Sequence, residues 1–350
     1  MLKNKKILYT VAIILVILPL FFMSDFRLSL LSKFWVFAIA AVAVNILWGY
    51  TGILSLGHGA YFALGGYAMA MYLKLKAQPL PDFMDWSGVE SLPWFWKPFQ
   101  YLPVALAMVV ILPVALSLLV GIPLFKSGTK GVYFTIISQA ITMILALLFI
   151  SEQGYTGGTN GITGFQSFLG YQMNDPMLVK VLYMISLGVL ILVLLFNRYM
   201  IKSYGGTIIQ AIRDRETRLR FLGYPTDWFK IVSLATSAAI AGIAGALFVP
   251  IVGIISPSSM GILASTELAI FVAVGGRATI LGPVIGALVV NFAKTSLSES
   301  MPDFWWYFYG AVFVAATLVF PKGIIGFFNG KENRKWKPVV PKWIKFNFQK

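Results

Sequence analysis

The stretch GYTGILSLGHGAYFALGGYAM, residues 49–69, places glycines and the only histidine of the chain, His58, inside a run of apolar residues. Glycine in a membrane segment allows a helix to break or two helices to approach closely. The ends of broken helices expose backbone donors and acceptors that a polar solute can use. We therefore expect interrupted helices here and in a later glycine-containing stretch. The expected breaks are at Gly57, Gly59, Gly65, Gly66, Gly275 and Gly276.

The composition of the whole chain indicates a membrane protein. It has 350 residues, of which 58% are hydrophobic and 12% charged, and a mean hydropathy of +0.80, more apolar surface than one soluble core can bury. Apolar runs long enough to cross a bilayer cover residues 7–23, 33–50, 101–122, 132–150, 178–196, 228–250 and 304–320, and shorter runs cover 59–73, 266–275 and 280–293. We expect an all-α, polytopic protein with about ten transmembrane helices.

The distribution of charge predicts the orientation. With the N-terminus in the cytoplasm, 21 of the 28 Lys and Arg residues lie on the cytoplasmic side, as the positive-inside rule requires, and both termini are cytoplasmic. Residues 266–293 must then enter the membrane and turn back, as two short helices or a re-entrant pair, with Arg277 at the inner turn. The run at 7–23 lacks a following cleavage site, so we interpret it as a retained helix and not as a secretory signal.

Several classes of function are disfavoured by the residue inventory. The chain has no cysteine and one histidine, which disfavours disulfides and a zinc or di-iron centre, so no metal site is expected. The net charge of +15 lies mostly in cytoplasmic loops and in a basic tail, residues 331–350, where topology and anionic lipid headgroups account for it better than nucleic acid does. No phosphate loop or nucleophile elbow is present, so we expect a transport protein and not an enzyme.

Two stretches of the chain resemble each other. TGILSLGHGAYFALGG, from Thr51, and MGILASTELAIFVAVG, from Met260, share six of sixteen positions, and the copies would cross the membrane in opposite directions. Inverted repeats of this kind build transporters whose path lies at the repeat interface. We expect two inverted five-helix repeats, about 7–150 and 178–320, in one permease domain over residues 1–330. The candidate substrate-path residues are His58, Glu267, Thr266, Thr159 and Asn160.

These polar residues also have ordinary structural interpretations. His58 lies near the cytoplasmic end of its segment, where it could occupy wet interface or satisfy a carbonyl. A carboxylate inside a membrane, as at position 267, is costly enough to need a reason. The external segment 74–103 is rich in Trp and Pro, which fits a lid or a docking surface, or the commoner aromatic anchoring at the interface.

A charged cytoplasmic loop, residues 197–230, separates the sixth and seventh runs. Within it, residues 207–222 have apolar positions near helical spacing and a glycine stop at Gly223, which predicts a short amphipathic helix. Acidic residues among its arginines argue against a purely lipid-binding face. The helix could instead present its apolar stripe to a soluble partner, or stand as a solvated loop helix.

Ordered matches over residues 34–328 resemble a known family. The stretches that carry the likeness are LWGYTGILSLGHGAYFALGGYAM, KGVYFTIISQA, GGTNGITGF, IQAIRDRETRLRFLGY, AGIAGALFVP, VAVGGRATILGPVIGA and FPKGIIGF. The chain resembles the permeases of the branched-chain amino acid and urea group of ABC importers. LPDFMDWSGVESLPWFWKPF at 80–99, the segment 253–282 and FWWYFYGAVF at 304–313 resemble the urea-type branch more than the leucine-type branch.

The resemblance implies a multi-pass subunit of the bacterial inner membrane. It implies pairing with a second related permease, two cytoplasmic ATPase subunits that bind ATP and Mg, and an external solute-binding protein, with no cofactor bound by this chain. It also implies that the loop is a coupling helix that docks on the ATPase, in a degenerate form that departs from the fuller motif of other importers. The implied coupling residues are Ala211, Ile212, Arg213, Asp214, Arg215, Glu216, Leu222, Gly223 and Tyr224.

We expect alternating access driven by the partner ATPases, with urea as the solute. The alternative is a branched-chain amino acid or another short amide or amino acid, because composition alone does not distinguish these solutes. A stand-alone channel or gradient-driven carrier is a second class, for which a coupling loop would have no use. An intramembrane enzyme is a third class, disfavoured by the lack of a nucleophile or of an acid and base pair on facing spans.

Overall fold

Most of the chain between the first and last expected spans is described by the structure. The structure is a computed structural model, and it describes residues 19–129, 131–173, 175–300, 307, 310, 311, 314 and 323–328. Residues 7–18 of the expected span at 7–23, most of the expected span at 304–320 and the basic tail lie outside the described residues, and α2 (Pro19–Phe22) begins the described part.

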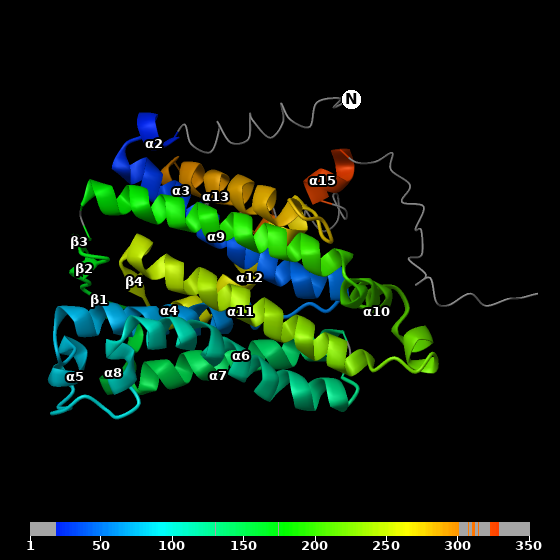
Figure 1. Cartoon of the computed structure of the whole chain (residues 1–350), viewed down its shortest axis with the longest axis horizontal. Helices are drawn as coiled ribbons and strands as arrows, with labels where there is room; N and C mark the ends of the chain where they lie inside the picture. The colour runs from blue at the N-terminus through cyan, green and yellow to red at the C-terminus, as the bar shows by residue number, and fades with distance from the viewer. Residues whose placement is uncertain are drawn as a thin grey trace, which may run out of the picture.

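Long apolar helices form the body of the molecule. Five described helices are long and apolar enough to cross a bilayer: α3 (Asp25–Asn45) with its continuation η1 (Ile46–Thr51), α6 (Leu102–Lys126), α7 (Val132–Ser151), α9 (Pro176–Lys202) and α11 (Thr226–Val252). The shorter runs correspond to α4 (His58–Ala77), α12 (Ile262–Gly275) and α13 (Gly282–Ser300). The chain is therefore a polytopic membrane protein, and its long helices lie side by side (Figure 1).

The two ends of the bundle differ in structure. One end carries α5 (Asp82–Trp86), η2 (Lys97–Gln100), α8 (Gln153–Thr156), η3 (Gly158–Asn160) and η4 (Pro257–Met260). Two short strand pairs add to the mostly helical fold: β1 (Ile162–Thr163) pairs antiparallel with β4 (Ile254–Ile255), and β2 (Ser167–Phe168) with β3 (Tyr171–Gln172). The opposite end carries α10 (Tyr204–Phe221) and α15 (Gly323–Phe328) (Figure 1). Pairing of these short strands satisfies backbone N–H and C=O groups in loops outside the helices.

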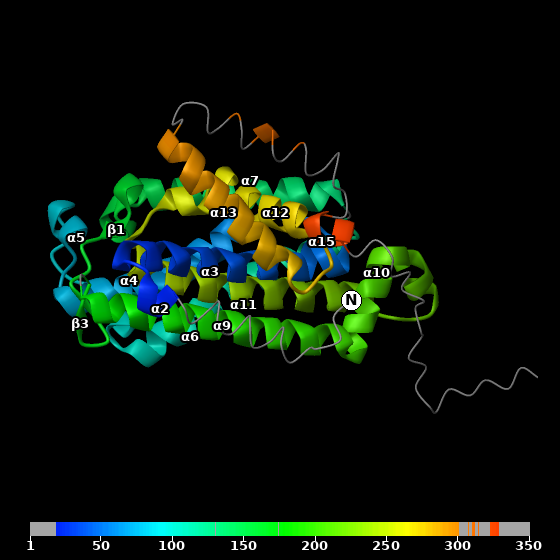
Figure 2. The same cartoon turned by 90° about the horizontal axis from the view of Figure 1, so that it is seen from above.

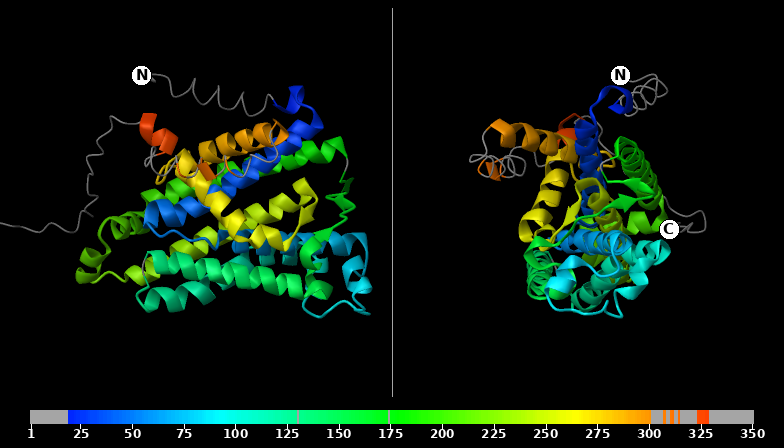
Figure 3. Two further views of the ribbon diagram at one scale, coloured as in Figure 1. Left: turned by 180° about the vertical axis from the view of Figure 1, so that it is seen from behind. Right: turned by 90° about the vertical axis from the view of Figure 1, so that its left-hand side faces the viewer.

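The segment 266–293 forms two separate helices. α12 ends at Gly275 and α13 begins at Gly282, so that Arg277 lies in the turn between them. The two helices pack against each other and against α3. Seen from above, α3 lies between this pair and α9 (Figure 2), and both helices face the viewer when the molecule is turned by 180° (Figure 3).

Glycines inside α4 are packing positions and not helix breaks, which corrects the expectation for Gly59, Gly65 and Gly66. The helix is continuous from His58 to Ala77. A Cβ at Gly65 would lie 2.1 Å from the carbonyl oxygen of Gly242 on α11, and one at Gly59 would lie 2.6 Å from the Ser265 hydroxyl on α12. Two backbones can approach this closely only where the side chain is absent.

Two sets of three helices have the same pattern of contacts. α11 packs against α4 and α6, and α4 packs against α6. α3 packs against α12 and α13, and α12 packs against α13. If α3, α4 and α6 correspond to α11, α12 and α13, as the expected repeats require, each contact of one set has a counterpart in the other. The packing therefore has the pattern that two related halves predict.

Candidate functional site

A groove lies where the two sets of helices meet. It has a volume of about 260 Å³ and is lined by Phe37, Gly59, Phe62, Phe248, Ser258, Ser259, Leu263, Ala264, Glu267 and Leu268. Small-molecule sites in proteins typically have volumes of roughly 300–1,000 Å³. The groove is therefore near the lower limit, which suits a solute of the size of an amino acid or smaller.

Three phenylalanines from different helices form the apolar wall of the groove. Phe37 comes from α3, Phe62 from α4 and Phe248 from α11. The ring centroids lie 6.3 Å apart for Phe37 and Phe62, 5.7 Å for Phe37 and Phe248, and 5.3 Å for Phe62 and Phe248. These separations are in the range of favourable aromatic pairs. Movement of any of the three helices would change the shape of this wall.

Charged groups lie at one side of the aromatic wall. The Lys294 ammonium on α13 donates to the Glu267 carboxylate on α12 at 2.7 Å, and the Glu267 side chain is 16% exposed. The ammonium of Lys33 lies 5.9 Å from the centroid of the Phe37 ring. The groove thus combines apolar surface with a carboxylate and ammonium groups nearby. Such a combination can bind a molecule that carries both charges.

His58 is buried in the packing of three helices. It has no exposed surface and does not line the groove. Its Nδ1 lies 3.2 Å from the Ser55 carbonyl oxygen, and its Nε2 lies 2.6 Å from the hydroxyl of Ser237 on α11, which in turn donates to the Ala43 carbonyl of α3. These contacts fit the structural interpretation of a satisfied carbonyl, and a role of His58 in the path stays a prediction.

The other predicted path residues lie around the groove. Thr266 is half-buried on α12, next to Glu267, and donates to the Ile262 carbonyl of its own helix. Thr159 and Asn160 are exposed in η3, which packs against η4, the element that supplies Ser258 and Ser259 to the groove. The structure therefore brings one predicted residue, Glu267, into the groove lining, while Thr266, Thr159 and Asn160 lie outside the lining.

The chain is non-helical between η1 and α4, at residues 52–57. Hydroxyls of α7 bind its backbone: Thr135 donates to the Leu54 carbonyl at 2.7 Å, and Ser138 accepts from the Leu56 amide at 3.2 Å. Gly57 immediately precedes α4. Non-helical backbone within a membrane requires such protein partners. The other expected break lies at the end of α12: the helix ends at Gly275, and Gly276 adopts a φ of 125° that favours glycine.

The predicted cytoplasmic helix is present as α10, with a kink. Arg215 has non-helical backbone angles, φ −155° and ψ 76°, so that two helical segments meet there. The first segment packs on the bundle through Ile208, Ile209 and Ile212, which are buried. Of the other predicted coupling residues, Ala211, Glu216 and Tyr224 are half-buried, and Arg213, Asp214, Arg215, Leu222 and Gly223 are exposed. The second segment therefore leaves much of its surface open to a partner.

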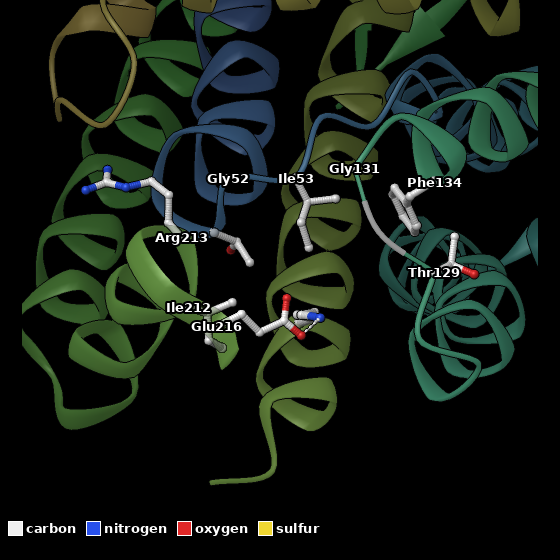
Figure 4. Close-up of a pocket in the computed structure, with 10 residues that line it drawn as sticks. Gly52, Ile53, Thr129, Gly131, Phe134, Ile212, Arg213 and Glu216 are labelled. Carbon is white, nitrogen blue, oxygen red and sulfur yellow. Dashed lines mark hydrogen bonds and ion pairs between the residues drawn. The ribbon is translucent and has the colours of Figure 1, made fainter. Parts of the chain in front are cut away.

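An ion-pair network fixes α10 to the start of α11. Lys230, whose side chain is 3% exposed, pairs with Glu216, and Arg220 lies 3.0 Å from Glu216 and 2.5 Å from Asp227. A hollow of about 150 Å³ adjoins this network, and Figure 4 shows Glu216 pointing into it while the guanidinium of Arg213 points away. Loss of one member of such a buried pair leaves an uncompensated charge.

The predicted external segment folds around aromatic contacts. The ring of Trp96 packs on Phe99 with centroids 4.9 Å apart, and its indole N–H donates to the Tyr155 carbonyl at 3.1 Å. Trp86 and Trp94 are 83% and 80% exposed. The segment thus has a buried anchor and two exposed indoles, which fits either anchoring in the interface or contact with an external protein.

Sequence reasoning missed several residues of these sites. The three groove phenylalanines lie on runs that look like ordinary spans, and Lys294 directly follows the run at 280–293, where only its positive charge distinguishes it. Phe221 was also missed, although it is 87% exposed at the end of α10. No group of three or more potential metal-ligating side chains occurs in the described part of the chain.

Comparisons with known proteins identify relatives of the chain. The family described as "Branched-chain amino acid transport system / permease component" matches residues 26–317. Two relatives are each called "High-affinity branched-chain amino acid transport system permease protein LivM", from Escherichia coli (strain K12) and Salmonella typhimurium (strain LT2). Each is 24% identical over 348 residues, which cover 92% of this chain and 75% of the relative. No solved structure matches significantly.

Proposed function

Because the chain belongs to the family of branched-chain amino acid transport permeases, we propose that it carries branched-chain amino acids across the bacterial inner membrane. It is a multi-pass membrane permease of a bacterial ABC transporter family and not the ATPase of the system. The expectation of urea as the solute is supported less well than its alternative, because both relatives are described as branched-chain amino acid permeases.

The groove is the observation that carries this proposal. A branched-chain amino acid is a zwitterion with a compact apolar side chain. The aromatic wall offers apolar surface for that side chain, and Glu267 and Lys294 offer partners of both signs for its ammonium and carboxylate. The groups already neutralise each other, so an exchange of partners leaves no unpaired charge in the membrane.

We propose alternating access as the mechanism. The two expected repeats, whose helices pack in equivalent pairs, would rock against each other around the groove. The proposed partners are a second related permease, two cytoplasmic ATPases that bind ATP and Mg and dock on α10, and an external solute-binding protein. The exposed apolar residues at the end of α10, Phe221 and Leu222, support the docking site.

Urea is the second candidate solute. Its support is the likeness of residues 80–99, 253–282 and 304–313 to the urea-type branch. Urea is neutral and rich in hydrogen-bonding groups, so it would use the hydroxyls of Ser258 and Ser259 and one carboxylate, and would gain little from the phenylalanines. The two candidates therefore predict different sensitivity to changes in the aromatic wall.

Uptake by the reconstituted importer tests the proposal. The permease pair, ATPases and binding protein would be placed in liposomes with internal or external ATP, and uptake of labelled leucine and labelled urea measured side by side. We expect ATP-dependent uptake of leucine. ATP-dependent uptake of urea alone would replace the solute assignment with the second candidate. Equal uptake without the ATPases would overturn the importer assignment and favour a channel or a gradient-driven carrier.

A further inference from the structure

The end of α3 has an unusual conformation. Residues Ile46–Thr51 form the π-helix η1, which ends at Gly52 with a φ of 81°. π-Helical turns are rare, and those that are found often lie at functional sites. η1 faces the end of the bundle that carries α10 (Figure 1), and it packs against both α10 and α11. The proposed function leaves this turn without a role.

η1 is joined directly to the cytoplasmic helix. The Arg213 guanidinium on α10 donates to the Gly49 carbonyl at 3.0 Å. A Cβ at Gly52 would lie 2.8 Å from Cγ of Arg213, so the arginine stem lies flat against a turn that has no side chain there. Arg213 also lies 3.1 Å from Asp214, which helps to fix its guanidinium. A charge-assisted hydrogen bond of this kind is stronger than a neutral one.

The same turn is joined to the end of α12. Asn45, the last residue of α3 and directly before η1, is fully buried, accepts from the Ala278 amide at 3.0 Å and donates to the Thr279 carbonyl at 2.9 Å. The guanidinium of Arg277 lies 4.9 Å from the centroid of the Trp48 ring. The turn that ends α12, the helix of Glu267, is thus held by Asn45, which directly precedes η1, and by Trp48 of η1.

η1 is also connected to α4 along the chain. The non-helical residues 52–57 connect them, and His58 at the start of α4 is bound to Ser55 and Ser237. α4 and α12 supply Phe62 and Glu267 to the groove. One turn therefore contacts the cytoplasmic helix on one side and is linked to two groove-lining helices on the other.

We propose that η1 is the junction that transmits movement of α10 to the groove, and that Arg213 is the positioning residue through which it does so. This inference rests on the proposed function, because it assumes that ATPases move α10. Displacement of Arg213 would shift the Gly49 carbonyl. The shift would reach the α12 turn through Asn45 and would reach α4 through residues 52–57. Because η1 is packed tightly on both sides, we expect it to switch between two arrangements and not to deform gradually.

Transport per ATP tests the junction. In the complete reconstituted importer, Arg213→Ala is expected to retain the ATPases and their hydrolysis of ATP, while solute taken up per ATP falls roughly tenfold, the effect of losing one charge-assisted hydrogen bond. Arg213→Lys, which can still donate to the Gly49 carbonyl, is expected to recover part of the loss. Lys126→Ala is the control. It removes an exposed cation at the end of α6, outside the cytoplasmic loop, and should behave as wild type.

The outcomes separate the junction from the proposed function. An unchanged ratio of uptake to ATP hydrolysis in Arg213→Ala would overturn the role of Arg213. Loss of the ATPases from purified Arg213→Ala, with the permease pair intact, would also overturn it and make Arg213 a docking residue. Failure of the wild-type assembly to couple uptake to ATP would instead overturn the proposed function.

Discussion

The ammonium of Lys294 lies 2.7 Å from the carboxylate of Glu267, so that α13 neutralises a charge in the wall of the groove. An unpaired carboxylate within a membrane is costly, and carboxylates there usually have a partner and a function. The Lys294 side chain is 39% exposed, and that of Glu267, which lines the groove, is 16% exposed, so neither charge is sealed in the core. It is therefore suited to exchange partners with a charged solute.

Removal of the charge at Glu267 should impair transport more than folding. In Glu267→Gln the amide can still accept from Lys294, so we expect a folded protein whose uptake falls roughly tenfold or more, the effect of one lost charged contact in the transport step. Uptake of leucine and thermal unfolding would both be measured. Glu90→Gln, an exposed external carboxylate, is the control. Wild-type uptake by Glu267→Gln would remove it from the path.

A side chain at Gly65 should destabilise the bundle. The Cβ of Gly65→Ala would lie 2.1 Å from the Gly242 carbonyl oxygen, so α4 and α11 must separate. We expect a loss of about 1–3 kcal/mol, the usual cost of overpacking. The matched control is Gly188→Ala in α9, where nothing lies within 4 Å of the new Cβ and helix propensity favours Ala. Tryptophan fluorescence during thermal unfolding in detergent would measure both, and equal stabilities would contradict the packing argument.

The buried ammonium of Lys230 is neutralised by the carboxylate of Glu216. Glu216→Gln removes the nearer carboxylate from a 3% exposed ammonium, which keeps the more distant Asp227 carboxylate, 3.7 Å away, and has Arg220 still nearby. We expect a loss of stability of roughly 3 kcal/mol. Adding Lys230→Met should recover most of it, because the buried charge is then gone. A double variant no more stable than Glu216→Gln would show that the charge is not the cause.

The exposed end of α10 should be needed for the ATPases and not for the fold. Phe221 is 87% exposed, so Phe221→Ser should leave the free energy of unfolding of the permease within about 0.5 kcal/mol of wild type. Co-purification of the ATPases should fall, since exposed aromatic residues are frequent anchors of interfaces. Phe26→Ser, 70% exposed at the opposite end of the bundle, is the control. Full recovery of ATPases by Phe221→Ser would argue against this surface.

The external segment should show a pH-dependent stability. Hydrogen bonds from Lys74, at 2.8 Å, and from Gln78 hold the pKa of Asp82 below its ordinary value of 3.8. A lowered folded-state pKa stabilises the fold above the ordinary pKa, and the effect is lost as the pH falls through the lowered pKa. Asp82→Asn should therefore be less stable at neutral pH by less than about 1 kcal/mol, because Asp82 is half exposed.

The comparison is made by thermal unfolding of both proteins at neutral and acidic pH. We expect the difference between wild type and Asp82→Asn to disappear below the lowered pKa of Asp82. Asp85→Asn, on the same short helix and exposed, is the control. A difference that persists in acid would assign the effect to packing of the carboxyl group and not to its charge.

Some features follow from local sequence alone. Run length and polarity predicted the five long spans, because a helix in a bilayer must satisfy its own backbone and show an apolar surface. The pair α12 and α13 followed from charge, since an uncharged loop and Arg277 must lie on opposite sides. The helix α10 followed from apolar spacing and the glycine stop, although its kink at Arg215 did not.

Other features depend on what each residue meets in space. Glycines in sequence can signal either a break or a close approach, and only the position of Gly242 beside Gly65 decides for packing. His58 could line a path or satisfy a carbonyl, and Ser55 and Ser237 surround it.

The sequence by itself determined that the chain is a membrane bundle with a charged helix between two long spans, because the bilayer acts on composition and on local periodicity. The tertiary structure decided which residues form the groove and the junction. Glu267 meets Lys294, and Arg213 meets Gly49, across 27 and 164 residues of chain. Contacts over such separations depend on helix packing, which no local pattern records.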